Sequence, residues 1–363
     1  MLSGIAICYL RIVPQSLQRT WSFPIVTSDI ESDPRVQAIR RWLDGIKGLA
    51  GAEMAPASAD ASFRRYFRVR TDSGSRIVMD APPDKENCEP FIRIATQLVS
   101  FGLNAPEILE KDLQQGFLLL SDLGSVQFLP KLQGDAGLVD TLYGDAINAL
   151  VQLQENGTTA QKQLPPYDDK LLRIELSLFS DWLCGRHLGV EIADDPSWIN
   201  TCNMLVDNAL EQPGVFVHRD YHSRNLMFVD GHNPGILDFQ DAVEGPYTYD
   251  LVSLLKDCYI RWPADRVLQF ATAFFEKRRG GLPDDIDRAT FIRHFELMGV
   301  QRQLKAAGIF ARLNHRDGKP AYMLDIPRTL NYVLEIVPRY AELEWLGSQI
   351  AKNVLPALEQ EST

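Results

Sequence analysis

The chain has 363 residues, of which 45% are hydrophobic and 23% are charged, so it has enough apolar material for a packed core in two domains or lobes. Its formal net charge is -11 and no block of Lys or Arg stands out, which argues against binding to nucleic acid or to an anionic membrane surface. We therefore expect a small-molecule partner.

The cysteines and the N-terminal segment indicate the compartment. Five cysteines are scattered without a C-x-x-C pair, which disfavours a disulfide framework and a zinc ribbon and fits the reducing cytoplasm. The apolar stretch 4–10 is far shorter than the roughly 20 residues that span a bilayer, and no cationic residue precedes it. Residues 1–33 show no sustained periodicity, so we expect a poorly ordered extension or a mis-assigned start.

The first elements of the folded part are predicted to be a helix and a hairpin. After Pro34, apolar residues recur at helical spacing from Val36 to Ile46, which indicates an amphipathic helix. Residues 63–70 and 76–80 read as two antiparallel strands around the turn-forming segment 71–75. This segment therefore predicts a β-hairpin.

Further strands precede a change to helices. A helix is predicted over 91–101, a short strand over 106–109 and a strongly apolar strand over 116–120. Strands cluster before Gly124, and helical periodicity dominates after it, so we expect a hinge near Asp122. The later helical patterns lie at 171–182, 249–260, 265–278 and 289–311.

The segment that carries chemistry follows an apolar strand at 215–217. It reads His218-Arg219-Asp220-Tyr221-His222-Ser223-Arg224-Asn225, an H-R-D-x-x-x-x-N pattern. A turn at 230–234 leads to a second predicted apolar strand, 235–239, which contains Asp238. We expect the two apolar strands to fold back together as a hairpin.

Such a hairpin brings Asp220, Asn225 and Asp238 together. Carboxylate and amide oxygens form a hard donor set that suits Mg²⁺ rather than zinc. Phosphoryl transfer needs a metal to neutralise phosphate charge and a carboxylate to receive or orient the acceptor hydroxyl. We predict Asp220 as the catalytic base and Asn225 and Asp238 as the metal ligands.

Three neighbouring residues have structural interpretations. His218 and His222 are four residues apart, but no Glu follows His218 and the preceding strand disfavours a helical zinc motif. We expect His218 to be a buried hydrogen-bonding residue that holds the loop, and His222 to lie nearer the substrate. Asp250 is interpreted as a helix cap or a structural partner of the catalytic loop rather than a third metal ligand.

The segment resembles the catalytic and metal-binding loops of the protein-kinase-like fold. Asp238-Phe239-Gln240 replaces the usual Asp-Phe-Gly, and the chain runs directly into Pro246-Tyr247-Thr248-Tyr249-Asp250-Leu251 without an Ala-Pro-Glu segment. This pattern is similar to the aminoglycoside phosphotransferase and choline kinase branch, which implies ATP and Mg²⁺ as cofactors and a small-molecule acceptor. The implied fold is α+β and bilobal, with a small sheet-rich N-lobe (34–124) and a larger, mainly helical C-lobe (125–363).

A closer resemblance covers nearly the whole chain from about Arg35 and is to the bacterial cell-wall sugar kinases. It implies ATP-dependent phosphorylation of the anomeric hydroxyl of N-acetylmuramate or N-acetylglucosamine in peptidoglycan recycling, in the cytoplasm. The segments that carry it are Asp60-Ala61-Ser62-Phe63-Arg64-Arg65-Tyr66-Phe67-Arg68, Met79-Asp80-Ala81-Pro82-Pro83, residues 218–241 and Ala311-Arg312-Leu313-Asn314-His315-Arg316-Asp317-Gly318-Lys319-Pro320.

The residues expected to bind the ATP phosphates depart from the general kinase pattern. The lysine expected at the end of the second hairpin strand is missing from residues 77–80. We hypothesise that Arg64 or Arg65 reaches the phosphates instead. Adenine is expected to bind backbone groups of residues 117–123 at the lobe junction. The predicted nucleotide-binding residues are Ser62, Phe63, Arg64, Arg65, Asp122 and Leu123.

The sequence signals for residues that bind the acceptor are less specific than those of the catalytic segment. The apolar row at 171–182 is mainly a core stripe, within which Glu175 and Asp181 are candidates. Arg312, Arg316 and Asp317 could be a solvated run, but an Arg fork suits the carboxylate of a lactate-bearing sugar. The predicted substrate-binding residues are Glu175, Asp181, His222, Arg312, Arg316 and Asp317.

Two alternatives stay open at this point. The same site could phosphorylate an aminoglycoside, choline or another sugar. The missing lysine would also fit a catalytically dead nucleotide-binding module, although intact Asp220, Asn225 and Asp238 argue against it. A monomer is expected, because no heptad pattern or long exposed apolar edge is evident.

Overall fold

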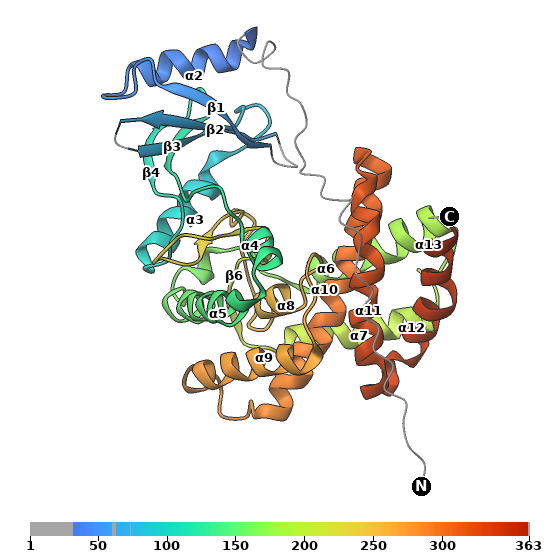
Figure 1. Cartoon of the computed structure of the whole chain (residues 1–363). Coiled ribbons are helices and arrows are strands. Elements are labelled where there is room, and N and C mark those ends of the chain that lie inside the picture. Colours follow the sequence, from blue (N-terminus) through green and yellow to red (C-terminus); the bar gives the residue numbers. More distant parts are fainter. Residues whose placement is uncertain (1–31, 60–62, 73, 362–363) are drawn as a thin grey trace. The chain divides into compact units, whose positions relative to one another are not determined.

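The computed structural model describes residues 32–59, 63–72 and 74–361 (Figure 1). The chain divides into two compact units, residues 1–53 and 54–363. Most of the predicted N-terminal extension, and Ser62 among the predicted site residues, lie outside the described residues. Within the described ranges, no helix combines the length and the apolar character that crossing a membrane requires.

In the first unit, the helix predicted after Pro34 is confirmed as α2 (Pro34–Asp44). The Asp33 side chain caps it by accepting a hydrogen bond from the Arg35 N–H at 2.8 Å, and Pro34 fits the first turn because it lacks an N–H.

The second unit begins with a five-stranded sheet. The order is β1-β2-β3-β5-β4, and β2 pairs antiparallel with β3 from Arg65 opposite Asp80 to Thr71 opposite Gly74. This confirms the predicted hairpin. The predicted helix 91–101 is confirmed as α3 (Cys88–Ser100), which buries its apolar face. The strands are β1 (Glu53–Ala59), β2 (Arg65–Thr71), β3 (Gly74–Asp80), β4 (Ile108–Asp112) and β5 (Phe117–Ser121).

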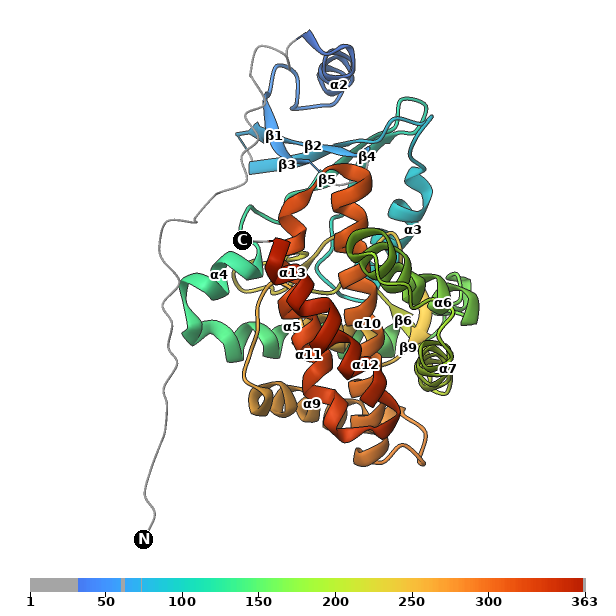
Figure 2. The same ribbon diagram turned by 90° about the vertical axis from the view of Figure 1, so that its right-hand side faces the viewer.

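Helices follow the sheet, as the change in periodicity predicts. Figures 1 and 2 show α10 running through this helical part, where it contacts α6, α7, α8 and α11. Two long helices that the sequence reasoning did not single out are α5 and α7. The helices are α4 (Phe128–Gly134), α5 (Val139–Asn156), α6 (Asp169–Leu178), α7 (Pro196–Leu210), α8 (Tyr249–Leu255), α9 (Ala264–Arg278), α10 (Arg288–Asp317), α11 (Ile326–Ile336), α12 (Glu344–Gln349) and α13 (Leu355–Glu361).

Helix α10 is organised by its ends and by one glycine. Asp287 caps its start by accepting from the Thr290 N–H at 2.8 Å, and Gly318 ends it in the left-handed conformation with φ 63°. A Cβ on Gly308 would lie 2.2 Å from the Leu178 carbonyl carbon, so the absence of a side chain there permits close approach to the end of α6 and to the π-helical segment η4 (Phe179–His187).

The pairing expected around the catalytic segment is wrong in one respect. Strand β6 (Gly214–Val217) pairs with β9 (Val243–Pro246), whereas β7 (Leu226–Met227) pairs with β8 (Gly235–Ile236). The predicted strand 235–239 is therefore only two residues long. It ends early because Asp238 has φ 62°, a left-handed conformation that cannot continue a strand.

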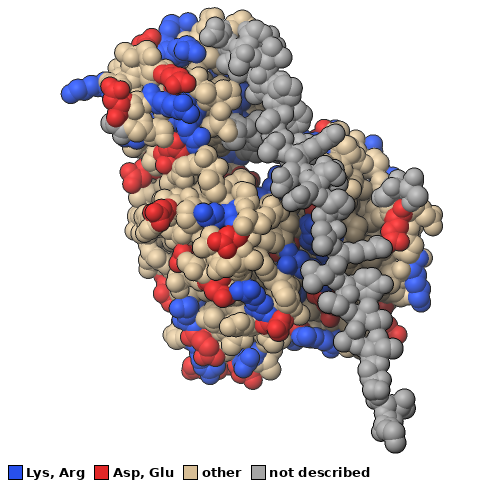
Figure 3. All heavy atoms as spheres, viewed as in Figure 1, with Lys and Arg blue, Asp and Glu red and all other residues tan. Residues whose placement is uncertain are grey.

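A single hydrophobic cluster of described residues extends from Met79 to Leu358 and joins α3, β5 and the C-terminal helices. The α+β architecture agrees with the expectation from sequence, and the lobe boundary at Gly124 stays a prediction. On the face shown in Figure 3, basic and acidic side chains are interspersed rather than collected by sign.

Candidate active site

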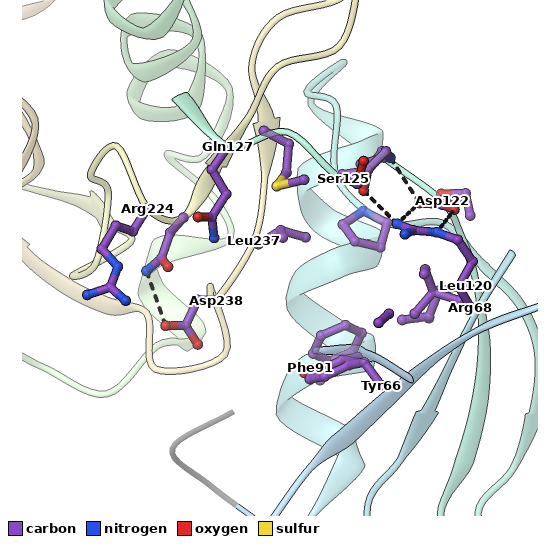
Figure 4. Close-up of a pocket in the computed structure, with 18 residues that line it drawn as sticks. Tyr66, Arg68, Phe91, Leu120, Asp122, Ser125, Gln127, Arg224, Leu237 and Asp238 are labelled. Carbon is purple, nitrogen blue, oxygen red and sulfur yellow. Dashed lines mark hydrogen bonds and ion pairs between the residues drawn. The ribbon is translucent and has the colours of Figure 1, made fainter. Parts of the chain in front are cut away.

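A cavity of about 340 Å³ lies within the second unit, between the sheet and the loops that follow β6 and β8. Figure 4 shows Arg224 and Asp238 on the side of these loops, with Arg68 and Asp122 on the side of the sheet. The lining residues are Ala57, Tyr66, Arg68, Ile77, Phe91, Pro106, Leu120, Ser121, Asp122, Leu123, Gly124, Ser125, Gln127, Arg224, Asn225, Met227, Leu237 and Asp238. Apolar walls with a few polar groups are typical of a small-molecule site.

The segment after β5 is fixed by an ion pair that reaches across the sheet. Arg68 donates from Nε to Asp122 Oδ2 at 2.6 Å, and its Nη2 donates to the Gly124 carbonyl at 2.8 Å (Figure 4). Burial opposes ionisation of Asp122, but its hydrogen bonds with Arg68, Ser75 and the Gly124 N–H lower its pKa overall. The predicted residues Asp122 and Leu123 line the cavity, with the Asp122 side chain already occupied by Arg68.

The catalytic segment is locked by His218 and Asp250. His218 Nδ1 accepts from the Asp220 N–H at 3.2 Å and Nε2 contacts the Leu237 carbonyl at 3.0 Å. Because Nδ1 accepts a hydrogen bond and Nε2 faces a carbonyl oxygen, His218 is the neutral tautomer that carries its proton on Nε2. Asp250 accepts from the backbone N–H groups of His218 (2.7 Å) and Arg219 (2.9 Å), and its side chain does not cap α8. The structural interpretations of His218 and Asp250 are therefore confirmed.

Asp220, Asn225 and Asp238 come together as the spacing predicts. Asn225 Nδ2 donates to the Asp220 carbonyl at 3.0 Å and to Asp238 Oδ2 at 3.2 Å. Because the amide nitrogen has these two acceptors, Asn225 Oδ1 remains for a cation. With the Asp238 carboxylate it forms a hard-oxygen pair on the wall of the cavity, and this donor chemistry fits Mg²⁺.

The Asp220 carboxylate is half-buried, and no described residue donates a hydrogen bond to it. Burial disfavours its charge, but Lys305, His222 and Arg302 lower its pKa overall. An ionised carboxylate without a hydrogen-bond donor is available to receive a proton.

Lys305 and Arg302 both come from α10. Arg302 donates to Cys258 Sγ at 3.5 Å, whereas Lys305 belongs to a buried ion-pair network. Lys305 Nζ lies 2.9 Å from Glu175 Oε1 and 2.8 Å from the Tyr249 hydroxyl, and Arg219 also pairs with Glu175. Burial would raise the pKa of Glu175, but Lys305 and Arg219 outweigh it and lower that pKa. Glu175 thus has its partners inside the protein.

Arg219 has φ 78°, an unfavourable backbone conformation for a long side chain. Its N–H bond to Asp250 and its ion pair with Glu175 hold it there. Sparsely populated backbone conformations of this kind concentrate at functional sites, where surrounding contacts maintain them.

The predicted phosphate-side residues surround the start of β2. Arg65 is paired with Asp80 at 2.6 Å, and the Phe63 N–H donates to Glu86 Oε1 at 3.0 Å. The Phe63 ring is exposed and lies under the Lys85 ammonium. Phe63, Arg64 and Arg65 are not among the residues that line the cavity.

The predicted acceptor-side residues are spread over two elements. Asp181 in η4 accepts from the Ser180 hydroxyl at 3.0 Å. At the end of α10, Arg316 is paired with Asp317 at 2.7 Å. Arg312 Nε and His222 Nδ1 are both buried without a hydrogen-bond partner among the described residues.

Sequence reasoning passed over the aromatic surroundings of the catalytic loop. Arg224 lines the cavity and lies over the rings of Tyr259 and Tyr322. Adjacency to Asn225 was the available signal for Arg224. Arg302 and Lys305 had a weaker one, since they share an α10 face with Arg312 and Arg316 at helical spacing.

Residues 53–289 match the model of a family described as "Phosphotransferase enzyme family". The chain belongs to this family. It is 46% identical over 335 residues to an N-acetylmuramate/N-acetylglucosamine kinase of Pseudomonas aeruginosa, covering 89% of this chain and 98% of the relative. It is 43% identical over 322 residues to a protein of the same name from Neisseria meningitidis, covering 87% and 95%. These matches establish the chain as a small-molecule kinase.

Solved structures confirm the kinase-like fold. A Plasmodium vivax ethanolamine kinase matches with a TM-score of 0.57 at 12% identity, covering 82% of this chain and 86% of its own. A choline kinase from Streptococcus pneumoniae gives 0.56 at 10% identity, covering 82% and 98%. A spectinomycin phosphotransferase gives 0.54 at 14% identity, covering 81% and 93%. The predicted family resemblance is thus confirmed.

Proposed function

We propose that the protein uses ATP and Mg²⁺ to phosphorylate the anomeric hydroxyl of N-acetylmuramate, N-acetylglucosamine or both. The observation that carries this proposal is the convergence of Asp220, Asn225 and Asp238 beside the cavity. The acceptor follows from the names of the relatives, which the chain matches over almost their full length. The reaction would serve peptidoglycan recycling.

Asn225 and Asp238 are the residues that would hold the metal. When bound, Mg²⁺ would neutralise charge on the transferred phosphoryl group. Hydrogen bonds from Asn225 Nδ2 and Gln240 Nε2 to the Asp238 carboxylate, at 3.2 and 2.9 Å, orient it before any ligand arrives. Such orientation of the ligands reduces the reorganisation required when substrate binds.

Asp220 would receive the proton of the anomeric hydroxyl while that oxygen attacks the γ-phosphorus. A new phosphorus–oxygen bond forms to the sugar, and the bond from the γ-phosphorus to the β,γ-bridging oxygen breaks, with its electron pair leaving on ADP. The neutral His218 fixes the Asp220 backbone, and Lys305 with Arg302 favours the charged carboxylate. Most of the acceleration would come from positioning and charge stabilisation.

The nucleotide would bind between the sheet and the catalytic loops, with adenine against residues 117–123. The Arg68–Asp122 pair supports this placement because it fixes the segment where the base would lie. Arg64 and Arg65 remain proposed phosphate contacts. For Arg65, such a role requires exchanging its Asp80 partner for phosphate or bridging the two.

The protein is proposed to act as a cytoplasmic monomer. Cys88, Cys184, Cys202 and Cys258 are buried free thiols, which supports a reducing compartment. Size-exclusion chromatography with light scattering tests the oligomeric state; a dimer would contradict the proposal.

The function is tested by measuring ATP- and Mg²⁺-dependent phosphate transfer to N-acetylmuramate, N-acetylglucosamine, choline and kanamycin. D220N is the control, and NMR of the product identifies the phosphorylated oxygen. An anomeric phosphate on either N-acetyl sugar, lost in D220N, supports the proposal. Turnover of only choline or kanamycin would show that the acceptor is an amine rather than an N-acetyl sugar. ATP binding without turnover of any acceptor would indicate a catalytically dead nucleotide-binding module.

A further inference from the structure

Arg224 is a cation of the cavity wall to which the steps above give no role. It directly precedes Asn225, and both residues line the cavity with Asp238 (Figure 4). Its Cζ lies 4.4 Å from the centroid of the Tyr259 ring and 5.9 Å from that of Tyr322. Arg224 thus joins a positive charge on the cavity wall to an aromatic surface beside the catalytic loop.

The aromatic surface is a cluster of Tyr259, Phe310 and Tyr322. Phe310 lies 5.6 Å from Tyr322 with 24° between the rings, and 6.3 Å from Tyr259 with 48° between them. Phe310 is buried and backs the cluster, whereas Tyr259 and Tyr322 are half-buried, so the two tyrosine rings are the surfaces that suit the apolar C–H face of a sugar.

Two features place this cluster beside the catalytic loop. Asp257 accepts hydrogen bonds from the backbone N–H groups of Ser223 at 3.0 Å and Tyr259 at 2.9 Å, so it joins the loop to the cluster. On the other side, the left-handed turn at Gly318 ends α10 and leads into η6 (Pro320–Asp325), which carries Tyr322. The glycine at this turn avoids the strain that a side chain would meet.

The guanidinium of Arg224 has no hydrogen bond or ion pair with any residue in the described ranges. Asp325, an acid in its electrostatic neighbourhood, is paired with Arg328 at 2.7 Å. A guanidinium that stacks on rings through its face keeps its N–H edge available for a planar anion. The chemistry therefore calls for a carboxylate or phosphate.

We propose that Arg224, supported by Tyr259 and Tyr322, binds the lactyl carboxylate of N-acetylmuramate and makes this acid preferred over N-acetylglucosamine. The inference rests on the proposed function, because the anomeric hydroxyl must lie at Asp220. Asp220 and Arg224 belong to one loop, in which Asn225, the neighbour of Arg224, donates to the Asp220 carbonyl at 3.0 Å, and the proposal places one sugar against both side chains. A phosphate of the nucleotide is the competing anion, and the test separates the two.

The test compares wild type with R224Q and R224K, using N-acetylmuramate, its uncharged methyl ester and N-acetylglucosamine as acceptors. R279Q is the matched control, because Arg279 also lies over a ring, that of Phe275 at 5.6 Å, but does not line the cavity. R224Q is expected to lower the ratio of kcat/KM for N-acetylmuramate to that for N-acetylglucosamine about 10- to 100-fold. R224K should recover part of the ratio, and R279Q should leave it unchanged.

Further measurements identify the anion. In wild type, the methyl ester should lose the advantage of the free acid. A loss in R224Q that is equal for all three acceptors, with a raised KM for ATP, would assign Arg224 to phosphate and overturn the proposal. An unchanged ratio in folded R224Q, as judged by its melting temperature, would also overturn it. If wild type phosphorylates neither sugar, the proposed function itself fails.

Discussion

The two sides of the cavity are held by charges of different kinds. On the catalytic side, Lys305, Glu175 and Arg219 form a buried network behind the loop. On the sheet side, Arg65–Asp80 and Arg68–Asp122 join a partly exposed arginine to a buried carboxylate. A buried network tolerates little change because an orphaned charge is costly, whereas a partly hydrated arginine can exchange partners. The surroundings of the catalytic loop are therefore fixed more firmly than the sheet side of the cavity.

The largest effect on kcat is expected from D220N, which removes the proposed base from the catalytic loop. Proton transfer by a positioned side chain contributes about 10²- to 10⁴-fold, so kcat should fall by that factor. The KM for ATP should change little, because Asp220 is not a cavity-lining residue. Steady-state kinetics with the preferred acceptor measures both constants, and a kcat within threefold of wild type would refute the assignment.

K305M should lower the free energy of unfolding by about 3–5 kcal/mol, because it leaves Glu175 with one buried cation fewer. R316Q is the matched control, since it breaks the solvent-screened Arg316–Asp317 pair and should leave the free energy of unfolding nearly unchanged. Urea unfolding monitored by circular dichroism gives both values. Equal losses in the two variants would remove the contrast between buried and exposed pairs.

Acidification should lower the stability of the folded protein through protonation of His218, which holds the catalytic loop. Burial lowers its pKa to about 4, below the usual 6.5 of an exposed histidine. Between these pH values the unfolded state binds more protons, so the free energy of unfolding falls as pH decreases, by up to about 3 kcal/mol. The Asp250 carboxyl, whose pKa burial raises to about 7, acts in the opposite direction.

Urea unfolding of wild type and H218N between pH 7 and pH 4.5 isolates the histidine, because Asp250 is present in both proteins. H218N should be less stable at pH 7 and should show a shallower dependence on pH. Parallel pH profiles for the two proteins would mean that His218 titrates normally in the folded state.

The smallest effect is expected on the sheet side. R68M removes the charge that fixes Asp122, and a partly exposed pair of this kind contributes about 1 kcal/mol. We expect a severalfold higher KM for ATP with kcat nearly unchanged. A decrease in kcat as large as that of D220N would show that the sheet side takes part in setting the reacting geometry.

The convergence of Asp220, Asn225 and Asp238 could be predicted from sequence because their spacing is local. Asp220 and Asn225 share one loop, and Asp238 follows after a short hairpin, although the pairing of strand 215–217 was predicted wrongly. The left-handed conformation of Asp238 has no signature in a run of apolar residues. A period-two pattern therefore overestimates the strand there.

The supporting groups could not be predicted in the same way. Lys305 lies 85 positions after Asp220, and nothing in its own neighbourhood indicates that the fold brings it to Glu175. Arg68 stands in a strand where alternate residues are exposed, so a partner 54 residues away had no local signal. Long-range ion pairs depend on the path of the whole chain.

The buried network of Lys305, Glu175 and Arg219 depends on the absence of a side chain at Gly308. The hydrogen atom that serves as its side chain sets the separation between α10 and the end of α6, since a methyl group there would collide with the Leu178 carbonyl. One turn earlier on the same helix is Lys305, and one turn earlier on α6 is Glu175. The missing side chain at Gly308 thus sets the helix separation at which Lys305, a cation that lowers the pKa of Asp220, can meet Glu175.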